Sequence, residues 1–209
     1  MSKMRSFIAS FWLDVGRIVP QCNADQFDPM INQSHHSVAK VFFALWPADS
    51  ERNDFKAWQA SLKPACGGRV MRAKSLHATL VFLGEIETDR LESLQLAAQE
   101  VSAEGFDLCW DEARYWGHNH IVYAAPVQVP PQLTRLVSAL EKSMAKHRFK
   151  FDKRDYQPHV TLLRNAHWSD VSLPIMPPVI WRVDEFTLVQ SSPEEYRVLM
   201  RFPLPASDG

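Results

Sequence analysis

The sequence predicts an α+β fold built mainly of antiparallel sheet. Short apolar runs of strand length alternate with stretches that repeat apolar residues at helical spacing. The alternation lacks a strict strand–helix–strand repeat, which disfavours a wholly parallel sheet. The chain also contains an internal repeat, because His-x-Thr-Leu occurs at residues 77–80 and again at residues 159–162. We therefore expect two similar, pseudo-symmetric lobes, residues 38–105 and 106–202, that face each other.

Each expected element has a local signature. Residues 40–46 form an apolar, aromatic run of strand length, and Pro47 follows it. Residues 49–62 repeat apolar side chains at Phe55, Trp58 and Leu62, which is the spacing of one helical face. Two further helices are expected at 89–101, with Thr88 as the N-cap, and at 132–147. Further strands are expected at 69–71, 76–83, 106–110, 120–125, 160–163, 179–189 and 196–202.

The N-terminal residues 1–37 are expected to lie outside the folded domain. Residues 7–19 are apolar, but Asp14 and Arg17 interrupt them, and they are shorter than the ~20 residues of a membrane span. Residues 20–37 show no apolar periodicity and have the composition of a linker. We expect residues 1–37 to be a mobile extension, a surface helix, or an upstream start-site artefact with Met30 as the initiator. The domain then covers 38–202, and residues 203–209 form a C-terminal tail.

The composition excludes several classes of protein. Lys and Arg total 23 against 24 Asp and Glu, so the net charge of −1 argues against a broad polybasic surface. The 7 glycines cannot be assembled into a dinucleotide-binding or P-loop motif. The 3 cysteines are odd in number and far apart, which disfavours a disulfide framework and a cysteine-based zinc ribbon. These features are typical of a reduced, cytoplasmic protein.

The repeated motif has a physical meaning on a strand. Side chains alternate between faces, so His77 and Thr79 are expected to share one face, and His159 and Thr161 likewise. The opposite face is expected to be apolar, with Ala78, Leu80 and Phe82 in the first copy and Val160 and Leu162 in the second. A single His beside a Thr is usually a hydrogen-bonded structural residue. Two copies with the same facing rule favour a shared site.

Two imidazoles and two hydroxyls have the chemistry of phosphoryl displacement. Histidine titrates near pH ~6.5, so one neutral and one protonated ring can coexist at cellular pH. Such a pair supplies a base for the attacking oxygen and an acid for the leaving oxygen. The hydroxyls can donate hydrogen bonds to the non-bridging oxygens of the phosphoryl group. This chemistry requires no metal.

The motifs and their flanks resemble the two-histidine (2H) phosphoesterase superfamily. Within it, the segments match the RNA 2′,3′-cyclic phosphodiesterases, also described as 2′-5′ RNA ligases. The segments that carry this resemblance are KVFFALW, GRVMRAKSLHATLVFLGEI, YQPHVTLLRNA and EFTLVQS, in the family's order between Val38 and Phe202. The resemblance implies a bilobal α+β fold with flanking helices, in which each lobe contributes one motif to a central cleft.

The resemblance also implies an activity and roles for the motif residues. The expected reaction opens a 2′,3′-cyclic phosphate at an RNA 3′ end to a 2′-phosphate, with reversible 2′-5′ ligation as a further activity. His77 is then the proton donor and His159 the proton acceptor, while Thr79 and Thr161 bind the substrate. No cofactor and no metal are implied. The expected partners are RNA 3′ ends with a cyclic phosphate, tRNA fragments among them, with no membrane association and a monomeric chain.

Other residues have both a functional and an ordinary interpretation. Arg164 is a candidate to hold the phosphate, but strict alternation places it opposite His159, so a strand end or bulge must turn it inward. Phe43 and Tyr156 are candidates to stack a nucleobase, although aromatics in such positions are more often core. The basic residues Arg69, Arg72 and Lys74 supply either a rim for RNA or an ordinary solvated face.

The remaining histidines show no metal-ligand spacing. The contiguous residues His118, Asn119 and His120 indicate a turn before a strand rather than a metal nuclease. Surface positions are expected for His35, His36, His147 and His167.

Three functions stay open from the sequence. The first is the RNA-end phosphodiesterase. The second is the same chemistry on small cyclic nucleotides or an ADP-ribose cyclic phosphate. The third is a non-catalytic RNA-end binding module, which the two intact motifs disfavour.

Overall fold

The computed structural model describes residues 37–168 and 173–206, and strand β1 (Val38–Leu45) opens the described part. The expectations for residues 1–36 therefore lie outside the described residues. Within the described part, no helix is long and apolar enough to cross a membrane.

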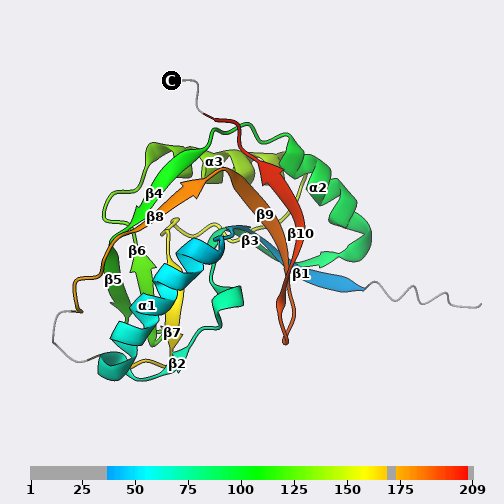
Figure 1. Cartoon of the computed structure of the whole chain (residues 1–209). Coiled ribbons are helices and arrows are strands. Elements are labelled where there is room, and N and C mark those ends of the chain that lie inside the picture. Colours follow the sequence, from blue (N-terminus) through cyan, green and yellow to red (C-terminus); the bar gives the residue numbers. More distant parts are fainter. Residues whose placement is uncertain (1–36, 169–172, 207–209) are drawn as a thin grey trace, which may run out of the picture. The chain divides into compact units, whose positions relative to one another are not determined.

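The main sheet has 8 strands among the described residues, in the order β10-β9-β1-β3-β7-β6-β5, with β2 also paired to β7 (Figure 1). Their bounds are β2 (Arg69–Val70), β3 (Ala78–Glu87), β5 (Glu112–Trp116), β6 (Ile121–Ala125), β7 (Val160–Arg164), β9 (Glu185–Ser191) and β10 (Tyr196–Pro203). A second sheet pairs β4 (Phe106–Trp110) with β8 (Val179–Val183). Every strand pair is antiparallel, so the α+β class with antiparallel sheet is confirmed.

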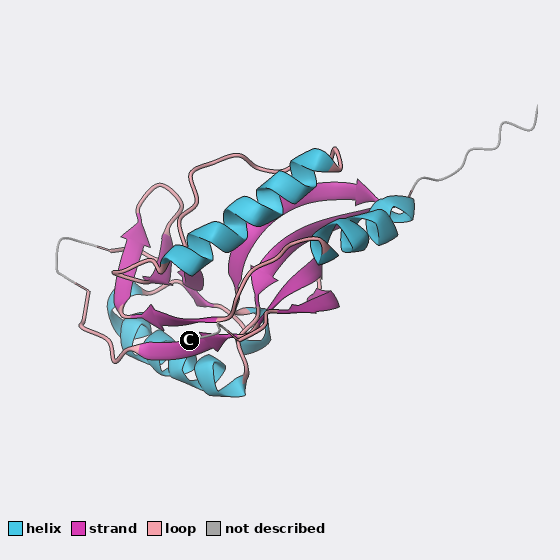
Figure 2. Cartoon of the chain, turned by 90° about the horizontal axis from the view of Figure 1, so that it is seen from above, coloured by secondary structure: helices cyan, strands magenta, loops and turns pink. Residues whose placement is uncertain are grey.

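Within the described part of the chain, three α-helices pack against these strands (Figure 2). Helix α1 (Asp49–Cys66) contacts β7 and β8, while α2 (Leu91–Gln99) packs on α3 (Pro131–Lys146), which also contacts β3. Two short 3₁₀ turns lie at Ala73–Ser75 and Thr88–Arg90. Strands from both sides of residue 105, the expected boundary between the lobes, pair in one sheet, since β9 and β10 continue the sheet from β1. The C-terminal strands β9 and β10 therefore extend the half of the sheet that holds β1 and β3, while β2, from before residue 105, pairs with β7 in the other half.

Several expected elements differ in detail. The single strand expected over 179–189 is two strands in different sheets, because the chain changes sheet at Asp184. Strand β5 was not expected, since none of its side chains is fully buried and its alternation is short, with only Ala113 and Tyr115 packed on the core. Thr88 does not cap a helix: its hydroxyl lies 2.6 Å from that of Ser37, and α2 begins only at Leu91.

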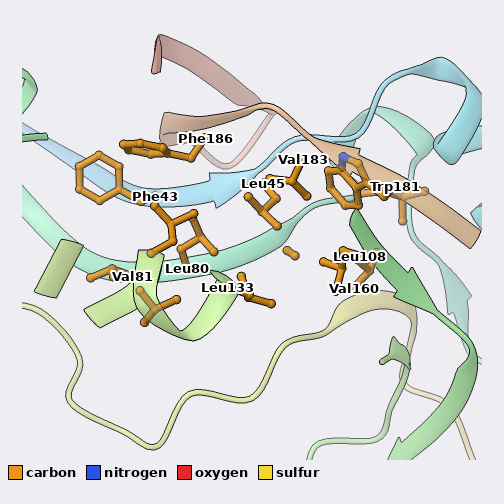
Figure 3. Close-up of a cluster of buried hydrophobic side chains, with 14 of the residues drawn as sticks. Phe43, Leu45, Leu80, Val81, Leu108, Leu133, Val160, Trp181, Val183 and Phe186 are labelled. Carbon is orange, nitrogen blue, oxygen red and sulfur yellow. The ribbon is translucent and has the colours of Figure 1, made fainter. Parts of the chain in front are cut away.

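The aromatic core lies on the face of β1 that turns away from the motif histidines. Phe43 is 0% exposed, and its ring packs 6.0 Å from Phe186 and 6.2 Å from Phe202, centroid to centroid (Figure 3). The prediction that Phe43 stacks a nucleobase is therefore wrong. Alternation along β1 sends Phe43 into the core and its neighbour Phe42 to the opposite face.

A glycine brings the short strand β2 close to β7. Gly68 has φ +72°, and a Cβ at this position would lie 2.6 Å from the Arg164 carbonyl oxygen and 2.8 Å from the Ala166 nitrogen. Both atoms are backbone, so they cannot rotate away. Only glycine allows this approach, which sets Arg69 opposite Arg164 in the sheet.

We expect Gly68→Ala to lower the free energy of unfolding by about 2 kcal/mol or more, through backbone strain and the clash with β7. Gly67→Ala is the matched control, because Gly67 also has positive φ (+61°) but a Cβ there meets nothing within 4 Å. Urea denaturation of the two variants measures the difference. Equal losses would show that the approach to β7 is not what requires glycine at residue 68.

Candidate active site

The two motifs meet at the centre of the main sheet. Ala78 of β3 is the antiparallel partner of Val160 of β7, and these are the same position of each His-x-Thr-Leu copy. His77 and His159 each stand immediately before their strand. Antiparallel pairing of equivalent positions brings both histidines to neighbouring strand ends.

Each motif contains a register shift at its last residue. In β3, Thr79 pairs with Ala44 and Val81 with Phe43, so Leu80 is the extra residue. In β7, Leu162 is the corresponding extra residue, between the partners of Tyr123 and Val122. A bulge of this kind reverses the facing of the side chains that follow it, as far as the next bulge.

The bulges decide where the fifth residue after each histidine lies. Arg164 lies on the same face as Thr161, and both side chains line one cavity. A bulge was the expected condition for Arg164 to face inward. Phe82 is the counterpart of Arg164 in the first copy, and it also lines the cavity. The expectation that Phe82 faces away from His77 is therefore wrong, because strict alternation ignored the bulge at Leu80.

The motif side chains share one cavity of about 210 Å³. His77, Thr79, His159, Thr161 and Arg164 line it together. The last four of these also line a wider groove of about 540 Å³. One imidazole pair, two hydroxyls and a guanidinium thus face a space open to a larger ligand.

Both imidazoles are held by the same backbone device. Nδ1 of His77 donates to the Ser75 carbonyl at 2.7 Å, and Nδ1 of His159 donates to the Gln157 carbonyl at 2.9 Å. A carbonyl oxygen only accepts, so Nδ1 carries the hydrogen in each ring. In the neutral form Nε2 is then the basic nitrogen.

The surroundings lower the pKa of both histidines. Burial is the main cause that lowers the pKa of His77 to about 4, and His159, Arg164 and Arg52 add to it, against the Ser75 hydrogen bond. Burial also lowers the pKa of His159, with Arg164 as a further cause. Both rings are therefore neutral near pH 7 before an anion binds.

Aromatic side chains surround the histidines, and none of the four named here was predicted from the sequence as a site residue. The His77 ring lies 4.9 Å from Phe42, 5.0 Å from Tyr196 and 5.7 Å from Trp46, between centroids. Trp116 lies 4.7 Å from His159. Phe42 and Trp46 could have been found only with the facing of β1 known, and Trp116 lies on the strand that was not expected.

The other candidate residues lie around the site in different ways. Tyr156 lines the wider groove, and its buried hydroxyl has no hydrogen-bond partner among the described residues. Arg69 and Arg72 line a hollow beside the cavity. Lys74 forms an exposed ion pair with Glu195 at 3.9 Å.

The histidine tripeptide is a turn, as expected. Residues 117–120 form the turn before β6, and His120 has φ +53°. In residues 37–168 and 173–206 there is no group of three or more His, Cys, Asp or Glu side chains that could hold a metal. His147 contacts Glu100 at 3.0 Å on the surface, and His167 is exposed. His35 and His36 lie outside the described residues.

The fold and the paired motifs define a phosphoesterase of the 2H class. The model of the 2′-5′ RNA ligase superfamily matches residues 47–195, and the chain belongs to this family. This membership confirms the family named from the motifs.

Relatives in this family share sequence and fold with the chain. The RNA 2′,3′-cyclic phosphodiesterase of Escherichia coli is 34% identical over 156 residues, which are 73% of this chain and 87% of that protein. The Archaeoglobus fulgidus enzyme of the same name is 27% identical over 128 residues, 60% of this chain and 72% of its own. The crystal structure of E. coli LigT complexed with 3′-AMP superposes with a TM-score of 0.74 at 32% identity, covering 80% of this chain and 99% of that one.

Proposed function

We propose that this protein is an RNA 2′,3′-cyclic phosphodiesterase that opens the cyclic phosphate at an RNA 3′ end to a 2′-phosphate. The observation that carries the proposal is the shared cavity. Two histidines with identical Nδ1 anchoring face it, together with two threonine hydroxyls and Arg164. Two relatives, 34% and 27% identical to this chain, are named RNA 2′,3′-cyclic phosphodiesterases.

The proposed reaction divides the work between the two motifs. Nε2 of His159 takes a proton from water as the water oxygen attacks phosphorus, and His77 gives a proton to the 3′-oxygen as the P–O3′ bond breaks. Thr79, Thr161 and Arg164 donate hydrogen bonds to the non-bridging oxygens, whose charge develops in the transition state. A 5′-hydroxyl in place of water gives a 2′-5′ linkage, which is the ligase reaction.

The direct test is turnover of a short RNA that ends in a 2′,3′-cyclic phosphate, beside a cyclic mononucleotide and ADP-ribose cyclic phosphate. We expect the RNA to be hydrolysed and the product to carry a 2′-phosphate. Turnover of the small substrates alone would favour the small-nucleotide function. Binding of the RNA end without turnover would favour the binding module. A 3′-phosphate product would reverse the assigned geometry while leaving the site in place.

Hydrolysis is expected to survive exhaustive EDTA treatment, because the acid, the base and the hydrogen-bond donors of the proposed reaction are all side chains of this chain. The measurement is the initial rate before and after chelation. A loss of activity that a divalent ion restores would contradict the proposed mechanism.

The proposal also takes the enzyme to be a cytoplasmic monomer that acts on RNA ends such as tRNA fragments.

A further inference from the structure

A second hollow of about 330 Å³ lies beside the catalytic cavity. Arg69 and Arg72 line it from one side, and the β9–β10 turn, residues 191–196, lines it from the other. Arg164 belongs to both spaces, as do Ser75 and Tyr196. We name this space the arginine hollow. The two spaces therefore adjoin along these shared side chains.

The arginine hollow carries a net positive charge, because three arginines and two glutamates line it. Arg69 and Arg164 are direct partners across the β2–β7 pair, and like charges opposite each other on neighbouring strands are destabilising. Across residues 37–168 and 173–206, neither of them nor Arg72 forms an ion pair within 4.0 Å. Arg72 reaches only the Glu194 carbonyl, at 3.4 Å.

Two acidic residues, Glu194 and Glu195, also line the hollow, and their carboxylates bond to side chains other than its arginines. The Glu194 carboxylate accepts a hydrogen bond from the Ser192 hydroxyl at 3.0 Å. Glu195 pairs with Lys74, so neither carboxylate is bonded to an arginine of the hollow. Three guanidinium groups against two carboxylates leave an excess of positive charge around one space, on a chain whose net charge is −1, and this favours a bound anion.

We propose that the arginine hollow binds the phosphate on the 5′ side of the terminal nucleotide, so that the enzyme selects RNA chains over nucleosides that carry only the cyclic phosphate. This inference rests on the proposed function, because it takes the cyclic phosphate to occupy the catalytic cavity. In RNA, the next phosphate along the chain is the one on the 5′-oxygen of the same ribose. Arg164, shared by the two spaces, lies between the two phosphates. Forked guanidinium groups are suited to hold phosphate oxygens in pairs.

Binding of two small ligands separates this inference from the activity. Adenosine 2′-phosphate presents only the group for the catalytic cavity, whereas adenosine 2′,5′-bisphosphate adds the 5′-phosphate. By isothermal titration calorimetry at low salt, we expect the bisphosphate to bind about tenfold or more tightly, since one charge-assisted hydrogen bond contributes about this factor. In Arg69→Gln and Arg72→Gln the ratio of the two affinities should fall towards one.

Arg135→Gln is the matched control, because it removes the same charge from the exposed side of α3. It should leave the affinity ratio at the wild-type value. Equal affinities in the wild type, or an unchanged ratio in both hollow variants, would overturn the inference, and so would absence of binding by either ligand. The failure of the proposed function looks different: the ratio is then as expected, but no cyclic phosphate is hydrolysed.

Discussion

His77→Ala and His159→Ala are each expected to slow hydrolysis of the cyclic phosphate by about 10²–10⁴-fold, which is the usual contribution of a positioned general acid or base. Both rings line the same cavity, and each has its Nδ1 hydrogen fixed on a backbone carbonyl. Removal of either ring leaves one proton transfer without a partner. The measurement is single-turnover hydrolysis at saturating enzyme, which separates chemistry from product release.

Thr79→Val and Thr161→Val should cost less than either histidine variant, because Arg164 and the other hydroxyl still donate to the phosphate. His167→Ala is the control for loss of an imidazole, since His167 is exposed and outside the cavity. His77 packs among aromatic rings, so His77→Ala leaves a void. His77→Gln retains more volume and keeps the test valid if the alanine variant is unstable. Folded histidine variants with near-native turnover would disprove the site.

The sequence predicted strands and helices well where their apolar pattern was strong. The apolar run at 106–110 and the helical stripe of residues 132–147 correspond to β4 and α3 within a residue or two. Burial of one face produces both patterns, so they are visible without tertiary information. In strand β5 only Ala113 and Tyr115 pack on the core, and neither is fully buried, so its pattern is too weak to predict a strand.

The facing of the site residues could not be predicted in the same way. The extra residues Leu80 and Leu162 depend on how β3 and β7 meet β1 and β6, and nothing in the two leucines themselves marks a bulge. They nevertheless decide that Phe82 and Arg164 line the cavity. Likewise, the choice between Phe42 and Phe43 is a question of register, which two consecutive phenylalanines leave open.

The buried position of His77 among aromatic rings affects its proposed role as the general acid. His77 has a pKa of about 4, so it is largely unprotonated near pH 7, whereas a general acid must hold a proton. A bound phosphodiester brings a negative charge next to the ring, and an opposite charge within a few ångströms raises the pKa of a histidine. In the proposed reaction, the bound substrate is therefore expected to raise the pKa of His77, so that the ring can hold the proton that it gives to the 3′-oxygen. The pH–rate profile is expected to report the coupled pair rather than either histidine alone.

The low pKa of His77 also predicts a loss of stability in acid. The folded state holds the ring neutral down to about pH 4, whereas in the unfolded chain it takes up a proton near pH ~6.5. The contribution of the neutral His77 ring to the free energy of unfolding is therefore fully present above about pH 6.5. It is lost as the pH falls towards about 4, by up to roughly 3 kcal/mol.

Urea unfolding of the wild type and of His77→Gln, at pH 7 and again near pH 4.5, isolates this contribution. The carboxylates titrate in both proteins and cancel in the comparison, so the wild type should lose roughly 2–3 kcal/mol more than the variant on acidification. His167→Gln, which removes an exposed ring, should follow the wild type. The same pH dependence in the wild type and in His77→Gln would mean that the folded protein accepts a proton on His77 without penalty. The ring would then be ready to act as the acid before the substrate arrives.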